Sequence, residues 1–300
     1  MRFFNFREEI TKDDRFVVFG IPWDYLTSLD LPNSSKAPEN IRNITNDIGF
    51  TTELGFSIPN FQAADVGDVQ IEPTDIKLNL NNIDIFIKEF YTINEKIIPV
   101  MIGGDHFCSY PVIKAVADQL DKKEDFGVLI FDAHLDFYQE WDKGVYSHAT
   151  ISHRIYDLEY INNKNLLIVG TRDIDIEELE LANFEKIKFV NAYHMIDGLD
   201  YILDNIKEFF HRSGIKNLYI SIDIDALDPS IAPGTGYAIP GGFSYRDLWK
   251  ILKEIALEFN IIGFDLVEVA PNLDLENKMT LILAVKLIVE FMYFIRSSRP

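Results

Sequence analysis

Short, continuous apolar runs alternate along the chain with longer stretches in which apolar residues recur at helical spacing. The apolar runs are Phe16–Ile21, Ile97–Ile102, Val128–Phe131, Leu166–Val169, Lys188–Val190, Leu218–Ile222 and Ile261–Leu266. The clearest helical stretches between them are Tyr110–Leu120, Leu199–Phe210 and Tyr245–Phe259. Apolar strands that alternate with helices are typical of a parallel sheet covered on both faces. The pattern predicts one α/β domain over residues 1–300, with three α/β/α layers around a mostly parallel central sheet.

Acidic residues and histidines follow several of these strands directly. The segments are Gly103-Gly104-Asp105-His106, Asp132-Ala133-His134-Leu135-Asp136, Asp223-Ile224-Asp225 and Glu268-Val269-Ala270-Pro271. In open parallel sheets, ligands bind in the crevice outside the carboxyl ends of the strands. The sequence therefore predicts a functional site at that edge of the sheet.

The spacing of these acids and histidines predicts a metal site. Along an extended backbone every second side chain faces the same way, so Asp132, His134 and Asp136 should converge. Carboxylates held so close together repel one another unless a cation lies between them. A ligand set rich in oxygen favours Mn²⁺ over Zn²⁺. We predict two divalent metal ions per chain, held by His106, Asp132, His134, Asp136, Asp223 and Asp225.

Composition and charge exclude several classes of partner. The net charge of −20 disfavours a nucleic-acid ligand, because the phosphate backbone would be repelled. The most apolar segment, Met279–Ile295, is interrupted by Lys286 and Glu290, which predicts a buried terminal helix and no membrane span. The single cysteine, Cys108, cannot form an intrachain disulfide and is expected to be a small buried hydrophobe. We predict a cytoplasmic protein.

These motifs resemble the ureohydrolase superfamily, which includes arginases and agmatinases. Further matching segments are Gly20-Ile21-Pro22-Trp23-Asp24, Ala37-Pro38-Glu39-Asn40-Ile41-Arg42, the acidic turn Asp65-Val66-Gly67-Asp68, and the run from Ser221 to Gly242. The resemblance extends over nearly the whole chain. It implies an arginase-like α/β/α fold, two Mn²⁺ ions on the same six residues, and assembly as a homo-oligomer, either a trimer or a hexamer.

The resemblance also implies roles for residues near the metals. Asp136 would accept a proton from the attacking water and pass it to the departing amine, while two metal ions lower the pKa of that water. Glu268 matches the family's guanidinium-binding glutamate, with a surface salt bridge as the alternative. His148 matches a loop histidine that carries protons beside the substrate, with an ordinary exposed histidine as the alternative. The other histidines are expected at the surface: His153, His194 and His211.

Residues around the predicted site bear on the substrate, a small cationic guanidino compound. Phe137-Tyr138 after the Asp-x-His-x-Asp motif resembles agmatinases more than arginases, so Tyr138 is a candidate substrate contact. Tyr237-Ala238-Ile239 replaces the usual Thr-Pro-Glu, Phe107 replaces a small Ser, and Ala149 replaces a Gly. We expect Phe107 and the Tyr237 segment to make the rim of the pocket bulkier and more apolar. We rank agmatine first, then arginine, then guanidino acids such as guanidinobutyrate.

Three functions of different classes follow from these features. The first is a Mn²⁺-dependent hydrolase that releases urea, converting agmatine to putrescine. The second is a formimino or amide hydrolase, for which Glu268 would have no evident purpose. The third is a non-catalytic metal-binding subunit of an assembly, which should lack a metal ligand, whereas all six are present. A polar loop and a helix cap could mimic such motifs singly, but here three of them follow predicted buried strands.

Overall fold

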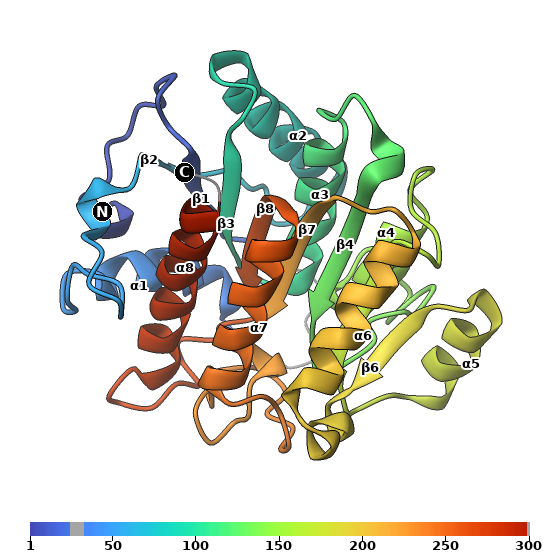
Figure 1. Cartoon of the computed structure of the whole chain (residues 1–300). Helices are drawn as coiled ribbons and strands as arrows, with labels where there is room; N and C mark the ends of the chain where they lie inside the picture. Colours follow the sequence, from blue (N-terminus) through green and yellow to red (C-terminus); the bar gives the residue numbers. More distant parts are fainter. Residues whose placement is uncertain (25–32, 299–300) are drawn as a thin grey trace.

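One parallel sheet organises the part of the chain that the computed structural model describes, residues 1–24 and 33–298. In that part, eight strands pair in the order β2-β1-β3-β8-β7-β4-β5-β6, and every pairing is parallel (Figure 1). The strands are β1 (Phe16–Ile21), β2 (Ala63–Asp68), β3 (Ile98–Gly103), β4 (Phe126–Phe131), β5 (Leu166–Thr171), β6 (Lys188–Asn191), β7 (Asn217–Asp223) and β8 (Asn260–Val267). The predicted parallel sheet is confirmed.

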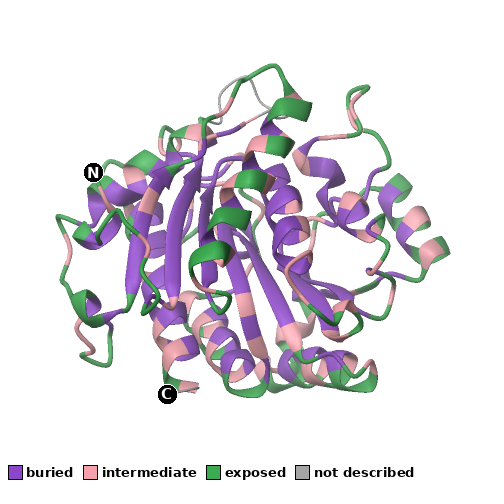
Figure 2. Cartoon of the chain, turned by 90° about the horizontal axis from the view of Figure 1, so that it is seen from above, coloured by how far each residue is buried: buried purple, intermediate pink, exposed green. Residues whose placement is uncertain are grey.

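Helices cover both faces of the sheet, as the sequence pattern predicts. They are α1 (Ala37–Ile44), α2 (Ile76–Ile93), α3 (Ser109–Ala117), α4 (Ile151–Tyr156), α5 (Ile176–Glu185), α6 (Leu199–Arg212), α7 (Tyr245–Glu258) and α8 (Met279–Ser298). One apolar core joins the sheet to α1, α6, α7 and α8, and the other joins it to α2, α3, α4 and α5. Figure 2 shows the strands mostly buried between helices whose outer faces are partly or fully exposed.

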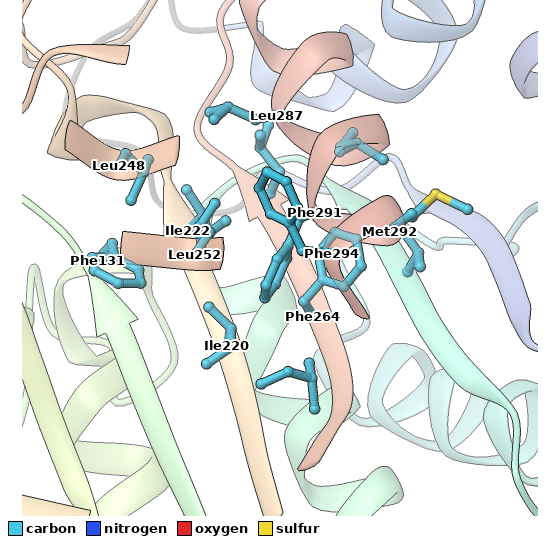
Figure 3. Close-up of a cluster of buried hydrophobic side chains, with 14 of the residues drawn as sticks. Phe131, Ile220, Ile222, Leu248, Leu252, Phe264, Leu287, Phe291, Met292 and Phe294 are labelled. Atoms are coloured by element: carbon cyan, nitrogen blue, oxygen red, sulfur yellow. The ribbon is translucent and has the colours of Figure 1, made fainter. Parts of the chain in front are cut away.

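Strand β7 shows how the sequence supplies both cores at once. Leu218, Ile220 and Ile222 face the core under α7 and α8, whereas Tyr219 faces the other core. In Figure 3, Ile220 and Ile222 lie with Phe264 of β8 against side chains of α7 and α8. Side chains of alternate residues point to opposite faces of a strand, so a continuous apolar run is buried on both sides. Burying each such side chain fully contributes about 1.5–3 kcal/mol to the free energy of unfolding, relative to leaving it exposed to water.

Strand β2 differs from what the sequence predicted. The segment Asp65-Val66-Gly67-Asp68 was expected to be an acidic turn, but it is the end of an edge strand beside β1. Its acids are tolerated because Arg42 of α1 donates hydrogen bonds from Nε to Asp65 Oδ2 at 2.7 Å and from Nη2 to Asp65 Oδ1 at 3.0 Å. A buried carboxylate paired in this bidentate way does not need water.

The C-terminal helix is buried, as predicted. Within α8, Glu290 is buried, and its Oε1 accepts a hydrogen bond from the backbone N–H of Glu53 at 2.6 Å and lies 3.6 Å from Lys286 Nζ. These contacts explain how an apolar helix carries a buried carboxylate beside a partly exposed lysine. In residues 1–24 and 33–298, no helix combines the length and apolar character that crossing a membrane requires.

Four neighbouring strands bring their carboxyl ends together at one edge of the sheet. In the order β3-β8-β7-β4, Ile102 pairs with Leu266, Leu266 with Ile222, and Ile222 with Phe131. These strands end in step, so the residues that follow them emerge side by side. This register places all four acidic and histidine-containing segments at one position on the sheet.

Candidate metal centre

The first group of candidate ligands surrounds His106. This histidine begins a short 3₁₀ turn after β3 and is fully buried. Its Nδ1 lies 2.9 Å from Asp132 Oδ2, 3.2 Å from Asp136 Oδ2 and 3.3 Å from Asp223 Oδ2. Three carboxylates from two other strand ends therefore converge on one imidazole nitrogen.

The second group surrounds His134. Its Nδ1 lies 3.0 Å from Asp225 Oδ2 and 3.3 Å from Asp132 Oδ1. Asp132 thus faces His106 with one oxygen and His134 with the other, so it links the two groups. Within His106, Asp132 and Asp136, and within Asp132, His134 and Asp225, the candidate ligand atoms lie within 4.8 Å of one another. The structure brings together all six residues that the sequence indicates.

Asp136 reaches the cluster by a route that the sequence analysis did not foresee. We expected an extended segment from Asp132 to Asp136, but these residues lie outside any strand, and Asp136 has φ 49°. The left-handed conformation is uncommon for residues other than glycine. Two hydrogen bonds hold the turn: Ser152 N–H donates to Asp136 O at 3.0 Å, and Phe137 N–H donates to Glu178 Oε1 at 2.8 Å. Alternation along a strand is therefore the wrong explanation for the convergence.

The electrostatics of the cluster indicate a cation. Burial and the neighbouring Asp132 carboxylate raise the pKa of Asp136 to about 7. Burial, Asp225 and Asp132 raise the pKa of Asp223 well above its usual range. Burial alone would lower the pKa of His106, but the surrounding carboxylates outweigh it and raise that pKa. The cluster thus retains protons because its negative charges repel one another, and bound cations would take the place of those protons.

The donor set fits a pair of divalent ions. His106 Nδ1 and Asp132 Oδ2 are buried, and within the described residues neither atom makes a hydrogen bond, although they lie only 2.9 Å apart. Buried polar atoms without a partner are rare, and here both belong to metal-ligating residue types. Four carboxylates and two imidazoles suit hard-to-borderline divalent metals such as Mn²⁺.

A hydrogen-bonded chain beneath the cluster orients His106. His106 Nε2 lies 3.1 Å from Ser221 Oγ, which in turn donates to Asp265 Oδ1 at 2.7 Å. The imidazole is thereby held with Nδ1 toward the carboxylates, as is usual for a metal-ligating histidine. Ser221 and Asp265 were missed in the sequence analysis. The sequence feature that could have indicated Ser221 is its position two residues before Asp223 on the same strand. Asp265 is identified by its pairing with Ser221 across β7 and β8.

Glu268 contacts the backbone of His106. It follows β8 with φ 61°, and its Oε1 accepts a hydrogen bond from His106 N–H at 2.7 Å. Burial and the nearby Asp105 carboxylate raise the pKa of Glu268 well above its usual range. This half-buried position differs from the surface salt bridge that the sequence left open as an alternative.

A cavity of about 380 Å³ opens from the metal cluster to the surface. Its lining includes the predicted residues His134, Asp136, Tyr138 and His148, whereas Glu268 lies outside it. The rest of the lining consists of Trp141, Ala149, Asp173, Ile174, Asp175, Glu178 and Tyr237. A larger cavity of about 520 Å³ is lined by residues at the amino ends of β1, β3 and β8, at the opposite end of the strands from these acids. The smaller cavity is therefore the better candidate for the substrate-binding site, because candidate metal ligands line it.

Two expectations about individual residues near this cavity are wrong. Phe107 does not line the rim; it is buried in the core against Trp23 and Tyr110, with ring centroids 5.8 and 5.6 Å away. His153 is not at the surface, because α4 packs it against the ring of Phe137 at 4.9 Å. In both cases neighbouring aromatic side chains bury a residue whose burial the local sequence did not indicate.

Other expectations hold. Cys108 is buried, and its Sγ lies 3.4 Å from the carbonyl oxygen of Trp23; burial raises the pKa of its thiol. His211 is exposed and lies 2.8 Å from Glu258, and His194 is partly exposed beside Asp197. None of these contacts involves the metal cluster.

Comparison with known proteins assigns the chain to a family. A model of the arginase family matches residues 14–293. The chain belongs to the arginase family, whose members are hydrolases that cleave carbon–nitrogen bonds.

Individual relatives differ in their substrates. A mitochondrial arginase of Medicago truncatula is 34% identical, over 91% of this chain and 80% of its own. An N(1)-aminopropylagmatine ureohydrolase of Thermus thermophilus is 32% identical, over 90% of this chain and 87% of its own. The solved structure of formimidoylglutamase from Bacillus subtilis has a TM-score of 0.87 and 26% identity, covering 100% of this chain and 93% of its own. The similarity establishes the family but does not identify the substrate, which must be inferred from the residues of the site.

Proposed function

We propose that this protein binds two Mn²⁺ ions at the six clustered residues and hydrolyses a guanidino compound, agmatine foremost, to urea and an amine. The observation that carries the proposal is the position of Asp132, whose two carboxylate oxygens face the two histidine-centred groups at 2.9 and 3.3 Å. A carboxylate placed in this way is suited to bridging a pair of metal ions. Putrescine and urea would be the products from agmatine.

Each residue at the site has a part in the proposed reaction. Bound divalent ions supply Lewis-acid chemistry, lowering the pKa of water and stabilising negative charge. Asp136 lines the cavity beside His106, where it can accept a proton and return it to the leaving amine. His148 lines the same cavity and can exchange protons with solvent, because imidazole titrates near neutral pH.

Glu268 is the proposed contact for the guanidinium group. Its Oε1 already accepts the His106 N–H, and a carboxylate has lone pairs to spare for the paired N–H groups of a planar guanidinium. Tyr138 lines the cavity and is the proposed contact for the rest of the substrate.

The charge of the cavity favours agmatine over arginine. Asp173 and Asp175 line it together with Asp136 and Glu178, whose raised pKa values reduce their charge near neutral pH, and the described lining contains no lysine or arginine. A substrate with a carboxylate, such as arginine or guanidinobutyrate, would meet repulsion there, whereas the ammonium of agmatine would be attracted. The proposed order of substrates is therefore agmatine, then arginine, then guanidino acids.

Urea release from four compounds tests the proposal. Mn²⁺-loaded protein should release urea fastest from agmatine, more slowly from arginine and guanidinobutyrate, and should not release formamide from formiminoglutamate. Faster urea release from arginine than from agmatine would overturn the substrate assignment. Turnover of formiminoglutamate alone would favour the formimino hydrolase, and stoichiometric metal binding without any turnover would favour the non-catalytic subunit.

The variant Glu268→Gln separates guanidinium recognition from metal binding. It should lower kcat/KM for agmatine by about 10- to 100-fold, because one charge-assisted contact is lost, while the metal content stays unchanged. An unchanged kcat/KM would contradict the assigned role.

A trimeric or hexameric assembly in the cytoplasm stays a prediction. Gel filtration with light scattering would check the assembly, and cell fractionation would check the location.

A further inference from the structure

A third cavity, of about 510 Å³, lies at the amino ends of β5 and β6. Lys164 precedes β5 by two residues, and Lys188 is the first residue of β6. The opposite, carboxyl end of β5 leads to Asp173 in the cavity beside the metal cluster. The rest of the lining consists of Asn163, Asn205, Glu208, Phe209, Arg212 and Ser213. Three segments that are distant in sequence therefore form one concave surface far from the metal ligands.

This cavity is positively charged. It is lined by Lys164, Lys188 and Arg212 and by one acid, Glu208, which gives the lining a net charge of +2 in a chain whose net charge is −20. The cavity beside the metal cluster has no basic residue in its described lining, and the cavity at the amino ends of β1, β3 and β8 has as many acids as bases. A concave surface of one charge sign raises the local concentration of counter-ions, which here are anions.

Two of the three cations have no counter-ion within the protein. Arg212 Nη2 lies 2.9 Å from Glu208 Oε2 on α6, and both side chains are largely exposed. Among residues 1–24 and 33–298, neither Lys164 nor Lys188 forms an ion pair. Arg212 also offsets the negative end of the α6 dipole, but the dipole gives no reason for two lysines on the facing segments. Each lysine ammonium can donate three hydrogen bonds to a ligand.

The residues of this cavity suit a phosphate monoester. A phosphate group carries nearly two negative charges at neutral pH and has three strong acceptor oxygens on one centre, so it can accept hydrogen bonds from two lysines at once. Phe209 is partly buried, with its ring packed edge-on against Phe210 at 5.0 Å, and offers apolar surface beside the cations. The volume lies in the range of cavities that bind small molecules.

We propose that Lys164, Lys188, Arg212 and Phe209 form an anion site, the basic cavity, which binds the phosphate group of a small organic phosphate with an aromatic or apolar body. The binding requires neither metal ions nor hydrolysis of a guanidine, so it does not depend on the proposed function. Strand β5 spans about 20 Å between the basic cavity and the cavity beside the metals, so the two sites can be occupied together.

Calorimetric titration of the Mn²⁺-loaded protein with phenyl phosphate tests the basic cavity. The titration would be made at pH 7.5 and low ionic strength, beside inorganic phosphate, which lacks the ring, and phthalate, which carries two carboxylates and no phosphate. We expect phenyl phosphate to bind more tightly than either comparison compound. Added salt should weaken its binding, because the lysines are exposed to solvent.

Three charge-reversal variants locate the bound phosphate. Lys164→Glu and Lys188→Glu should each weaken the binding of phenyl phosphate about tenfold or more, because a charge-assisted hydrogen bond is lost and a repelling charge is added. Lys122→Glu is the matched control and should bind within twofold of wild type. Lys122 is also exposed and precedes β4 at the same end of the sheet, but it lies outside the lining.

Several results would overturn the basic cavity. Phenyl phosphate held by the metal ions would bind wild type and both cavity variants equally. A loss in Lys122→Glu as large as in Lys188→Glu would indicate an effect of net charge alone, and wild-type protein that binds no phenyl phosphate would have no such site. Phthalate binding as tight as that of phenyl phosphate would refute the assignment to phosphates. If one cavity variant does not fold, as thermal unfolding would show, the other decides.

Discussion

Glu178 should make the metal-free protein less stable as the pH rises. Its side chain, on α5, is only 4% exposed, and its Oε1 accepts the Phe137 N–H that fixes the turn of Asp136. Burial and the Asp136 carboxylate raise the pKa of Glu178 from 4.5 to about 8. The folded protein therefore binds this proton more tightly than the unfolded chain does. The resulting stability is fully present below pH 4.5 and is lost as the pH rises through 8.

The size of the effect follows from the two pKa values. Each pH unit between them corresponds to about 1.36 kcal/mol, so raising the pH from 5.5 to 8.5 removes about 3 kcal/mol of unfolding free energy. Glu178→Gln cannot ionise and keeps an oxygen that accepts the Phe137 N–H. The variant should therefore lack this loss, and its stability relative to wild type should rise by about 3 kcal/mol over the same range.

Urea unfolding of the metal-free protein at pH 5.5, 7.0 and 8.5 measures the difference. Asp136 is present in both proteins, so the part of its titration that does not depend on Glu178 cancels in the comparison. Glu180→Gln, an exposed position on the same helix, serves as the control and should follow the wild type at every pH. Parallel pH profiles for wild type and Glu178→Gln would refute the reasoning, whatever the absolute stabilities.

Three further predictions concern single residues. Asp136→Asn should lower kcat about 100-fold or more in the urea assay, because it removes the proposed proton acceptor; near-normal turnover would contradict that role. Gly104→Ala would place a Cβ 2.0 Å from the Trp23 carbonyl oxygen and should destabilise the protein by about 1–3 kcal/mol in thermal unfolding, whereas Gly49→Ala, which meets nothing within 4 Å, should not. Cys108→Ser should keep kcat within twofold, since the buried thiol has no proposed part in the reaction; a large loss of turnover would show that it has one.

The sheet was predictable from sequence because its central strands carry continuous apolar runs. Strand β2 was not, since Ala63–Asp68 contains two acids and a glycine. This segment is a strand because it pairs with β1, and its buried acid is stabilised by an ion pair between Asp65 and Arg42, which comes from a helix more than twenty residues earlier. A local pattern does not contain a pairing of that kind.

The candidate ligands were predictable because each follows a strand whose end lies at the same edge. The path of the chain around Asp136 was not, because it depends on hydrogen bonds from Ser152 N–H to its carbonyl and from Phe137 N–H to Glu178. The aromatic wall of the cavity was also only partly foreseen. Tyr237 was expected at the rim, but Trp141 joins it through the folding of a loop that carries no periodic signal.

Metal stoichiometry tests the central claim most directly. Wild-type protein would be loaded with Mn²⁺, freed of excess metal by gel filtration and measured by elemental analysis beside Asp132→Asn, which alters the one residue common to both groups of ligands. We expect about two Mn²⁺ per chain in the wild type and a loss of most of this metal in the variant. Wild-type protein that retains no metal, or an Asp132→Asn variant that retains as much as the wild type, would contradict it.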